Sequence, residues 1–341
     1  MLGEGQRKGP LYVLGLLVLA ACGDATSDTP AVPGPTEGDP PPAPTPSGTA
    51  TGTEQPPTTP PATGACSGKT GTAGDRNVTL TSGGRERNFD LHVPATYDAT
   101  KRTPLVFVFH GYTQDAKGIA SATRFAKVAD AHGMIVAFPN GVGNSWNAGD
   151  CCGTGVSQNI DDVGFVRDMI KSLAGEYCVD EKRVFSTGFS NGGYMSYRLA
   201  CELSDAIAAA APVSGGIRMD PAVCNPKRPI ALFHAHGTND LIVPYNGGGL
   251  SGSRPVSDAI TAFRTKNKCP SGDGTVYYEK DDVSCRRWST CEAGTAVELC
   301  TIAGGGHQWP GGEALPYGGS PTKNLDASEA IAKFFEAHPM P

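Results

Sequence analysis

The stretch Arg183-Val184-Phe185-Ser186-Thr187-Gly188-Phe189-Ser190-Asn191-Gly192-Gly193 decides the fold of this chain. Its first half has the pattern of a β-strand, and its second half places a serine at the centre of a G-x-S-x-G pentapeptide. A strand that turns sharply into a helix at such a pentapeptide is typical of a nucleophile elbow. The flanking glycines lack the Cβ atoms that would clash in so tight a bend. We therefore expect Ser190 to be lifted clear of a sheet, with a helix beginning near Gly193.

Two further residues follow in the chain order Ser, Asp, His that α/β-hydrolases use. Asp240 lies in the loop just past a buried apolar strand, Pro229 to Phe233, whereas the other aspartates between Ser190 and His307 do not. His307 follows three glycines and a strand that ends at Ile302. We expect His307 to act as general base toward Ser190, with Asp240 holding the imidazole in the productive tautomer.

Backbone donors for a developing oxyanion can be placed in the same way. The first is expected from the residue after the nucleophile, which is Asn191. The second should come from the loop after the first long central strand, and here that loop is His110-Gly111-Tyr112-Thr113-Gln114. We assign the N–H of Tyr112 to this role, with the N–H of Thr113 as the neighbouring alternative.

Two tryptophans are expected near the same site. Trp146 is in the loop after a strand that ends at Phe138, and Trp309 is two residues after His307. Aromatic planes at the mouth of a site suit stacking against a phenolic ring or a sugar face. Together with Thr113, these tryptophans are therefore our candidate substrate-binding residues. The alternative is that both indoles only pack to hold their loops.

The remaining pattern indicates an α/β fold over residues 66–341. Continuous apolar runs, at Pro104 to Phe109 and Met134 to Phe138, are typical of strands covered on both faces. Helical patterns alternate with them, including one over 119–132, which favours a mostly parallel central sheet with helices on both faces. Alternating polar and apolar residues between Asn77 and Val93 predict an antiparallel hairpin at one edge of this sheet.

The first 65 residues have a different composition. Residues 1–21 resemble a signal peptide, with a short apolar run from Leu11 to Ala20. The run ends in Leu19-Ala20-Ala21-Cys22, which resembles a bacterial lipobox with Cys22 as the lipidated residue, although an ordinary signal peptide is the alternative. Residues 22–65 are rich in Pro, Thr and Gly and predict a disordered tether. We expect an extracytoplasmic, envelope-bound or secreted bacterial protein.

Cysteine usage agrees with export. The chain has 11 cysteines, and setting Cys22 aside leaves an even number that can pair completely. No C-x-x-C spacing occurs, which favours disulfides over zinc; Cys151 and Cys152 could bond to each other or to two separate partners. His234 and His236 share one strand face and could bind a metal, but no third ligand is evident. We therefore expect neither a metal nor a cofactor.

The overall charge narrows the range of partners. The formal net charge is −6, and the folded part has no long basic run. Capture of nucleic acid or of anionic lipid by the folded part is therefore not expected, and the lipid anchor is the only predicted membrane contact. The expected partner is an ester substrate, either small or carried on a polysaccharide.

At these residues the chain resembles the polyhydroxybutyrate depolymerase/feruloyl esterase family, which overlaps carbohydrate esterase family one. The resemblance spans roughly residues 66–338 and rests on His110-Gly111-Tyr112-Thr113-Gln114, Ser145-Trp146-Asn147, Asp161-Asp162-Val163-Gly164-Phe165, Gly188-Phe189-Ser190-Asn191-Gly192-Gly193, Asp240 and Gly306-His307-Gln308-Trp309-Pro310-Gly311-Gly312. It implies an α/β-hydrolase fold, ester hydrolysis through an acyl-enzyme, and a catalytic triad of Ser190, Asp240 and His307.

Two departures from the family pattern bear on the substrate. Polymer depolymerases of this type often have Cys where this chain has Tyr112, and Ala where it has Asn191. The resemblance therefore implies feruloyl or acetyl esters of plant-type polysaccharides as substrates, with polyhydroxyalkanoate depolymerisation as the alternative. A third hypothesis, from another class, is a non-catalytic binding lipoprotein that reuses the hydrolase fold.

Overall fold

The computed structural model describes residues 66–249, 252–316 and 318–341. The predicted signal peptide, the predicted tether and Cys22 lie outside these residues. Among the helices described, none is both long enough and apolar enough to cross a membrane.

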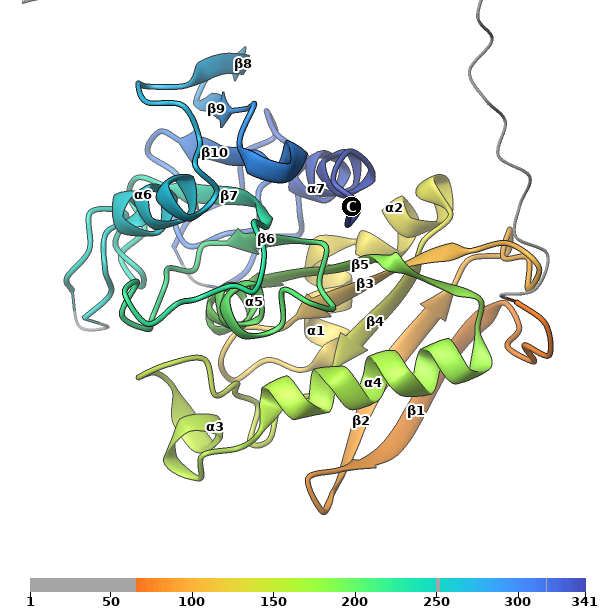
Figure 1. Ribbon diagram of the computed structural model, residues 1–341. Coiled ribbons are helices and arrows are strands. Elements are labelled where there is room, and N and C mark those ends of the chain that lie inside the picture. The colour runs from red at the N-terminus through yellow and green to blue at the C-terminus, as the bar shows by residue number, and fades with distance from the viewer. Residues whose placement is uncertain (1–65, 250–251, 317) are drawn as a thin grey trace, which may run out of the picture. The chain divides into compact units, whose positions relative to one another are not determined.

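The described residues form one ten-stranded sheet, in the order β1-β2-β4-β3-β5-β6-β7-β10-β9-β8 (Figure 1). The strands are β1 (Gly74–Ser82), β2 (Arg85–Val93), β3 (Thr103–Phe109), β4 (Ile135–Pro139), β5 (Val179–Phe189), β6 (Ala209–Val213), β7 (Ala231–Gly237), β8 (Thr275–Lys280), β9 (Val283–Trp288) and β10 (Val297–Ile302). The central strands β4, β3, β5, β6, β7 and β10 are parallel. An antiparallel pair closes each edge, β1–β2 on one side and β9–β8 on the other.

Helices cover both faces of the sheet. They are α1 (Ala116–Thr123), α2 (Phe125–His132), α3 (Gly153–Ser157), α4 (Asp162–Glu176), α5 (Asn191–Glu202), α6 (Val256–Lys266) and α7 (Ala327–Glu336), with a short 3₁₀ turn at Glu292–Gly294. The apolar sides of α4, α5 and α6 pack on one face, and those of α1, α2 and α7 pack on the other (Figure 1). The expected mostly parallel sheet with helices on both faces is confirmed.

The predicted elements agree with this arrangement, with one exception. The edge hairpin is β1–β2, and the two continuous apolar runs are β3 and β4, both fully buried. The helix expected over 119–132 is two helices, because Arg124 takes a left-handed conformation with φ 52°. The Arg124 N–H still closes α1 by donating to Ala120 O, and the chain restarts as α2 at Phe125.

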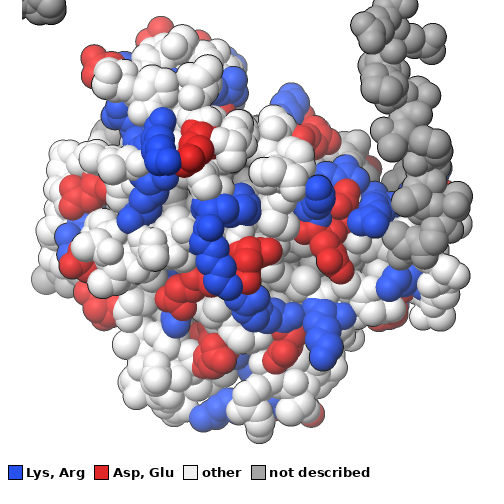
Figure 2. Space-filling view, viewed as in Figure 1, with Lys and Arg blue, Asp and Glu red and all other residues white. Residues whose placement is uncertain are grey.

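Charged side chains are mixed on the face shown in Figure 2, where basic and acidic groups lie interspersed. Several charged side chains of the described part pair directly; Arg167 and Lys227, for example, both contact the carboxylate of Asp205, at 3.1 and 2.7 Å. Exposed pairs of this kind add little to stability, with a typical contribution of about 0–1 kcal/mol. Their effect is to keep the local charge balanced.

Five disulfides link the ten cysteines of the described part. The pairs are Cys66–Cys178, Cys151–Cys152, Cys201–Cys224, Cys269–Cys291 and Cys285–Cys300. The predicted complete pairing is therefore found, and the adjacent cysteines bond to each other rather than to separate partners. The Cys285–Cys300 bridge joins residues that are register partners on β9 and β10. It thereby fixes the edge hairpin to the parallel sheet.

We predict that these bridges stabilise the fold very unequally. Cys201–Cys224 closes 23 residues and Cys151–Cys152 closes only one. Because a bridge stabilises mainly by restricting the unfolded chain, the double variant Cys201→Ser/Cys224→Ser should lower the free energy of unfolding by about 3 kcal/mol. The matched double variant Cys151→Ser/Cys152→Ser should lower it far less. Urea denaturation measures both, and equal losses would contradict this account.

Candidate active site

Ser190 lies at the turn between β5 and α5, at the carboxyl edge of the parallel sheet. Its φ of 56° and ψ of −116° are unfavourable for a residue with a side chain, and such strain costs roughly 1–3 kcal/mol. The flanking glycines are required by close backbone contacts. A Cβ atom on Gly188 would lie 2.5 Å from Gly192 O, and one on Gly192 would lie 2.1 Å from Phe109 O at the end of β3. The turn therefore has the form expected of a nucleophile elbow.

Asp240 and His307 come from loops at the same edge. Asp240 follows β7 and His307 follows β10, and these two strands pair in parallel. The loops are also joined by hydrogen bonds from Thr238 N to Ile302 O and from Asn239 N to Gly305 O, both 2.9 Å. His307 Nδ1 then lies 2.7 Å from Asp240 Oδ2. The structure thus brings together the acid and base predicted from the sequence.

The Asp240 carboxylate is almost completely enclosed and fully hydrogen bonded. Oδ1 accepts from the backbone N–H groups of Ile242 and Val243, at 2.9 and 2.8 Å. Oδ2 lies 2.7 Å from His307 Nδ1 and 3.2 Å from His236 Nε2. Burial alone would raise the pKa of Asp240, but hydrogen bonds from His236 and His307 outweigh it and hold that pKa well below its usual range. The carboxylate is therefore ionised at neutral pH.

The oxyanion donors can now be placed more narrowly. Asn191 begins α5 directly after Ser190, so its N–H belongs to the unpaired first turn of a helix. In the loop after β3, the Thr113 N–H donates to Asn144 O at 2.9 Å. This engagement removes Thr113 as an oxyanion donor and leaves the N–H of Tyr112 as the candidate from this loop.

The elbow and the oxyanion loop are tied together through Trp146. The Asn191 side chain accepts from Trp146 N at 2.7 Å and donates to Trp146 O at 3.2 Å. The Trp146 indole N–H donates to His110 O at 2.9 Å. His110 in turn bonds Gly111 O and accepts from Gly141 N, at 2.7 and 3.0 Å, and burial lowers its pKa to about 4, so it is neutral. Three loops at the site are thereby held in one arrangement.

The expectation that Trp146 and Trp309 stack on substrate is wrong. Both indoles are fully buried, each with 0% exposure. Trp146 packs edge-on against Phe109, with ring centroids 5.1 Å apart, and Trp309 donates to Ser328 Oγ on α7 at 3.0 Å. The structure instead agrees with the alternative, in which both indoles only pack to hold their loops. An aromatic residue near a motif is more often part of the core because its large apolar area favours burial.

A small pocket opens at the elbow. Its volume is about 170 Å³, and it is lined by Gly111, Tyr112, Thr113, Gln114, Phe189, Ser190, Ile242 and His307. Apolar side chains are exposed here and in the adjoining loop: Tyr112 at 46%, Ile242 at 43% and Leu241 at 82%. The sequence pattern did not single out Leu241 and Ile242 as site residues, although their position directly after Asp240 is a usable signal. These side chains, rather than the tryptophans, can contact a substrate.

Asp162 is another residue whose contribution the sequence did not reveal. Its carboxylate is buried at the start of α4, where it accepts from Asn147 N at 2.8 Å and pairs with Arg87 at 2.8 Å. The neighbouring Asp161 is the helix N-cap and accepts from Gly164 N. Through the bond to Asn147 N, Asp162 holds the loop that carries Trp146.

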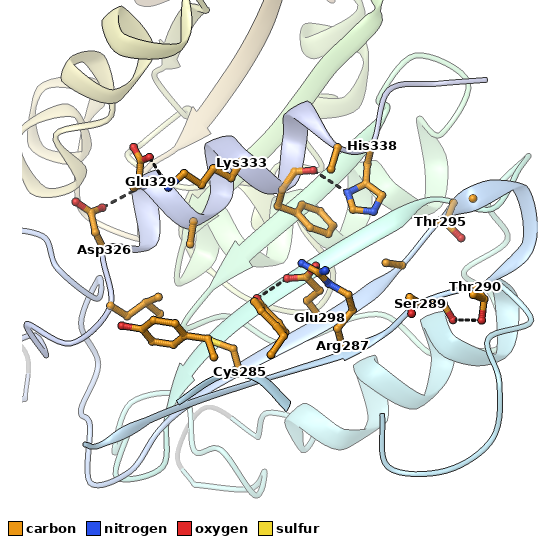
Figure 3. A pocket seen from close by; sticks show the side chains of 18 residues that line it. Cys285, Arg287, Ser289, Thr290, Thr295, Glu298, Asp326, Glu329, Lys333 and His338 are labelled. Carbon is orange, nitrogen blue, oxygen red and sulfur yellow. Dashed lines mark hydrogen bonds and ion pairs between the residues drawn. The ribbon is translucent and has the colours of Figure 1, made fainter. Parts of the chain in front are cut away.

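A larger cavity, about 520 Å³, lies away from Ser190 between the β8–β10 edge and α7 (Figure 3). Glu298 is buried there but is paired with Arg287 at 2.6 Å and accepts from the Tyr277 hydroxyl at 2.5 Å. His338, two residues past the end of α7, donates from Nδ1 to Phe334 O on that helix. The smaller pocket, by contrast, is lined by both Ser190 and His307, so ester chemistry is better placed there.

The residues that the structure describes include no group of three or more His, Cys, Asp or Glu positioned to hold a metal ion. His234 and His236, which share a strand face, bond to each other at 3.0 Å. Their remaining ring nitrogens contact Tyr197 and the Val243–Asp240 loop.

Comparisons with known proteins agree with the site. The family model described as "Esterase PHB depolymerase" matches residues 88–223. Feruloyl esterase B of Piromyces equi is 35% identical over 232 residues, which cover 65% of this chain and 42% of that protein. "Probable feruloyl esterase C" of Aspergillus niger is 30% identical over 198 residues, which cover 53% of this chain and 69% of that protein. The chain thus spans less than half the length of feruloyl esterase B.

Among solved structures, the acetyl xylan esterase from Aspergillus awamori has a similar fold. The TM-score is 0.54 at 13% identity, over 77% of this chain and 99% of that one. At this identity the likeness concerns the fold alone. Taken with the elbow, the Asp240–His307 pair and the sequence relatives, it places the chain in the polyhydroxybutyrate depolymerase/feruloyl esterase family of α/β-hydrolases.

Proposed function

We propose that this protein is a serine carboxylesterase that hydrolyses feruloyl or acetyl esters of plant-type polysaccharides. The observation that carries the proposal is the shared pocket of Ser190 and His307, with Asp240 hydrogen bonded to His307 at 2.7 Å. A binding protein would gain nothing from a strained serine next to an imidazole and a buried carboxylate. The non-catalytic hypothesis has no comparable observation in its favour.

In the first half of the reaction, Ser190 Oγ attacks the ester carbonyl and His307 Nε2 takes its proton. The ionised Asp240 accepts from His307 Nδ1–H, so it holds the reactive tautomer and stabilises the imidazolium. The N–H groups of Asn191 and Tyr112 stabilise the oxyanion. The ester C–O bond then breaks, the alcohol leaves with the proton from His307, and Ser190 remains acylated.

The second half repeats the same steps with water. His307 takes a proton from water, the hydroxide attacks the acyl carbonyl, and the bond to Ser190 Oγ breaks. The proton on His307 returns to Ser190 Oγ, and the carboxylic acid leaves. No cofactor or metal takes part in this scheme.

The substrate class is supported by the shape and chemistry of the pocket. It is small, and its exposed apolar groups Tyr112 and Ile242 suit an acyl group with a planar ring, while a bulky alcohol can remain outside. Both relatives named above are described as feruloyl esterases. The match to the polyhydroxybutyrate depolymerase model favours polyhydroxyalkanoate oligomers as the second candidate substrate.

The location that fits this activity is outside the cytoplasm. Five disulfides form within the described part, which favours an oxidising compartment. Cys22 is the eleventh cysteine and stands at the lipobox-like Leu19-Ala20-Ala21-Cys22. We propose that acyl chains on Cys22 hold the protein on a membrane, each buried methylene contributing about 0.8 kcal/mol.

We predict that Ser190 is the sole acylated nucleophile. Ser190→Ala should lower kcat by about four orders of magnitude or more, leaving only the contribution of binding and the oxyanion donors. A fluorophosphonate probe followed by peptide mass analysis should label Ser190 alone. The matched control is Ser196→Ala, because Ser196 is buried on α5 with its hydroxyl bonded to Ser186. Label on another serine, or an active Ser190→Ala, would exclude the assignment.

The exposed ring of Tyr112 should set substrate preference. Tyr112→Ala keeps the backbone N–H and removes only the ring, so kcat/KM for methyl ferulate should fall about 2- to 12-fold more than for p-nitrophenyl acetate. Tyr112→Phe keeps the ring and should stay close to wild type on both. An equal fall on both esters would show that the ring only supports the loop. Faster turnover of hydroxybutyrate oligomers than of methyl ferulate would favour the second substrate.

The lipid anchor can be tested separately from catalysis. Cys22→Ala should abolish incorporation of radiolabelled fatty acid during expression in a bacterial host and move the esterase from the membrane fraction to the soluble fraction. The activity per molecule should not change. Membrane retention of the Cys22→Ala protein, with no label in the wild type, would show that the N-terminus is not a lipoprotein signal.

A further inference from the structure

A chain of buried hydrogen bonds lies behind the Asp240–His307 pair. Tyr197 on α5 contacts His234 on β7, with the hydroxyl oxygen 2.9 Å from Nδ1. His234 Nε2 lies 3.0 Å from His236 Nδ1 on the same strand. His236 Nε2 lies 2.8 Å from Val243 O and 3.2 Å from Asp240 Oδ2. The three side chains are no more than 1% exposed, so they contact protein rather than solvent.

The direction of these hydrogen bonds is fixed at one end by a carbonyl. Val243 O can only accept, so His236 Nε2 must carry a hydrogen. With this hydrogen on Nε2, His236 Nδ1 accepts and His234 Nε2 donates to it. His234 Nδ1 consequently accepts from the Tyr197 hydroxyl. Each ring therefore has one tautomer, with the hydrogen on Nε2.

The opposite direction leaves a buried group unpaired. If His234 Nδ1 donated to Tyr197, the hydroxyl hydrogen would need another acceptor, and among the described residues the structure gives it none. An unpaired buried donor is destabilising. The environment agrees, because burial raises the pKa of Tyr197 and lowers that of His234 well below its usual value. Both groups therefore stay neutral.

This series of buried side chains ends beside the acid: the His236 Nε2–H that donates to Val243 O at 2.8 Å also lies 3.2 Å from Asp240 Oδ2. Two backbone N–H groups hold Oδ1 of Asp240, whereas Oδ2 is shared by His307 and His236. Removing His236 would leave Oδ2 with a single side-chain partner and would open space beside it. The carboxylate could then rotate away from the line that orients His307.

We propose that His236 is a positioning residue for Asp240, held in its Nε2–H tautomer by the buried pair Tyr197–His234. This role rests on the proposed esterase function. It extends the proposed site by His234 and His236 of β7 and Tyr197 of α5. His236 contacts no reacting atom, so it acts through Asp240 alone. Its effect belongs to the chemical step rather than to substrate binding.

The kinetic test compares His236→Leu, which removes the donor, with His236→Gln, whose amide can still donate to Oδ2 and accept from His234. In His236→Leu, kcat should fall about 10- to 100-fold, the equivalent of one hydrogen bond to a charged group, with KM within about twofold. His236→Gln should recover most of the loss. Tyr197→Phe, a milder change, should lower kcat less and also leave KM unchanged. A folded His236→Leu with the kcat of wild type overturns the proposal.

A matched control separates positioning from general sensitivity to histidine replacement. His132 lies on α2 and pairs with Glu329 and Glu336 of α7, away from the site. His132→Gln should keep kcat within about twofold. If His236→Gln and His236→Leu lose activity equally while His132→Gln does not, the ring shape matters rather than the donor, and the proposal is wrong.

The tautomers can be observed without any assay of activity. Two-bond ¹⁵N–¹H correlation spectra of the protein distinguish Nε2–H from Nδ1–H imidazoles, and signals missing in His234→Gln and His236→Gln assign the two rings. Both should be neutral Nε2–H forms. A Nδ1–H form at either ring overturns the proposal even if the protein is an active esterase. Loss of esterase activity in wild type, with both tautomers as expected, would instead contradict the proposed function alone.

Discussion

The close approach of the elbow to the end of β3 is the constraint on which the rest of the site depends. Gly192 leaves no room for a Cβ atom beside Phe109 O, and Gly188 leaves none beside Gly192. This contact sets Ser190 directly next to the loop that follows β3. Because the same loop carries the Tyr112 N–H, the proposed nucleophile and the proposed second oxyanion donor are positioned by one backbone contact. The strain at Ser190 is sustained because strands β3 and β6 hold β5 on both sides.

A second layer of contacts makes this geometry rigid. The side-chain amide of Asn191 bonds both the backbone N–H and the backbone carbonyl of Trp146. The indole N–H of Trp146 in turn donates to His110 O. On the other side, β7 and β10 supply Asp240 and His307 from adjacent parallel strands, whose loops are bonded to each other. The two halves of the site thus depend on different elements, and each half is fixed by its own set of hydrogen bonds. Such preorganised donors act without reorganisation during the reaction.

The sequence predicted the parts of the structure that follow from local pattern. Central strands such as β3 and β4 were recognisable because strands buried on both faces are apolar throughout. Ser190 was recognisable from its pentapeptide, Asp240 from its position just after an apolar strand, and His307 from its place after Asp240 in the chain order and after three glycines. The roles of Trp146 and Trp309 could not be predicted from the sequence. The sequence places each indole in a loop near the site, but it does not show whether the side chain faces the solvent or the core. The break at Arg124 was missed since the helical apolar pattern continues through it. Helix α6 and the β8–β9 hairpin were also missed, and β8 is mostly exposed, so it lacks the apolar alternation of a buried strand.

The shape of the site also bears on the kind of ester that fits. A pocket of about 170 Å³ can enclose only part of a substrate, and Leu241 and Ile242 extend the apolar surface outward beside the buried Asp240. An enzyme for small free esters gains affinity by enclosing the whole molecule. A small pocket provides less affinity of this kind, but it can accept the acyl group of an ester whose alcohol belongs to a polymer. The small volume and the exposed Tyr112 ring are therefore compatible with the proposed substrate, an ester attached to a polysaccharide.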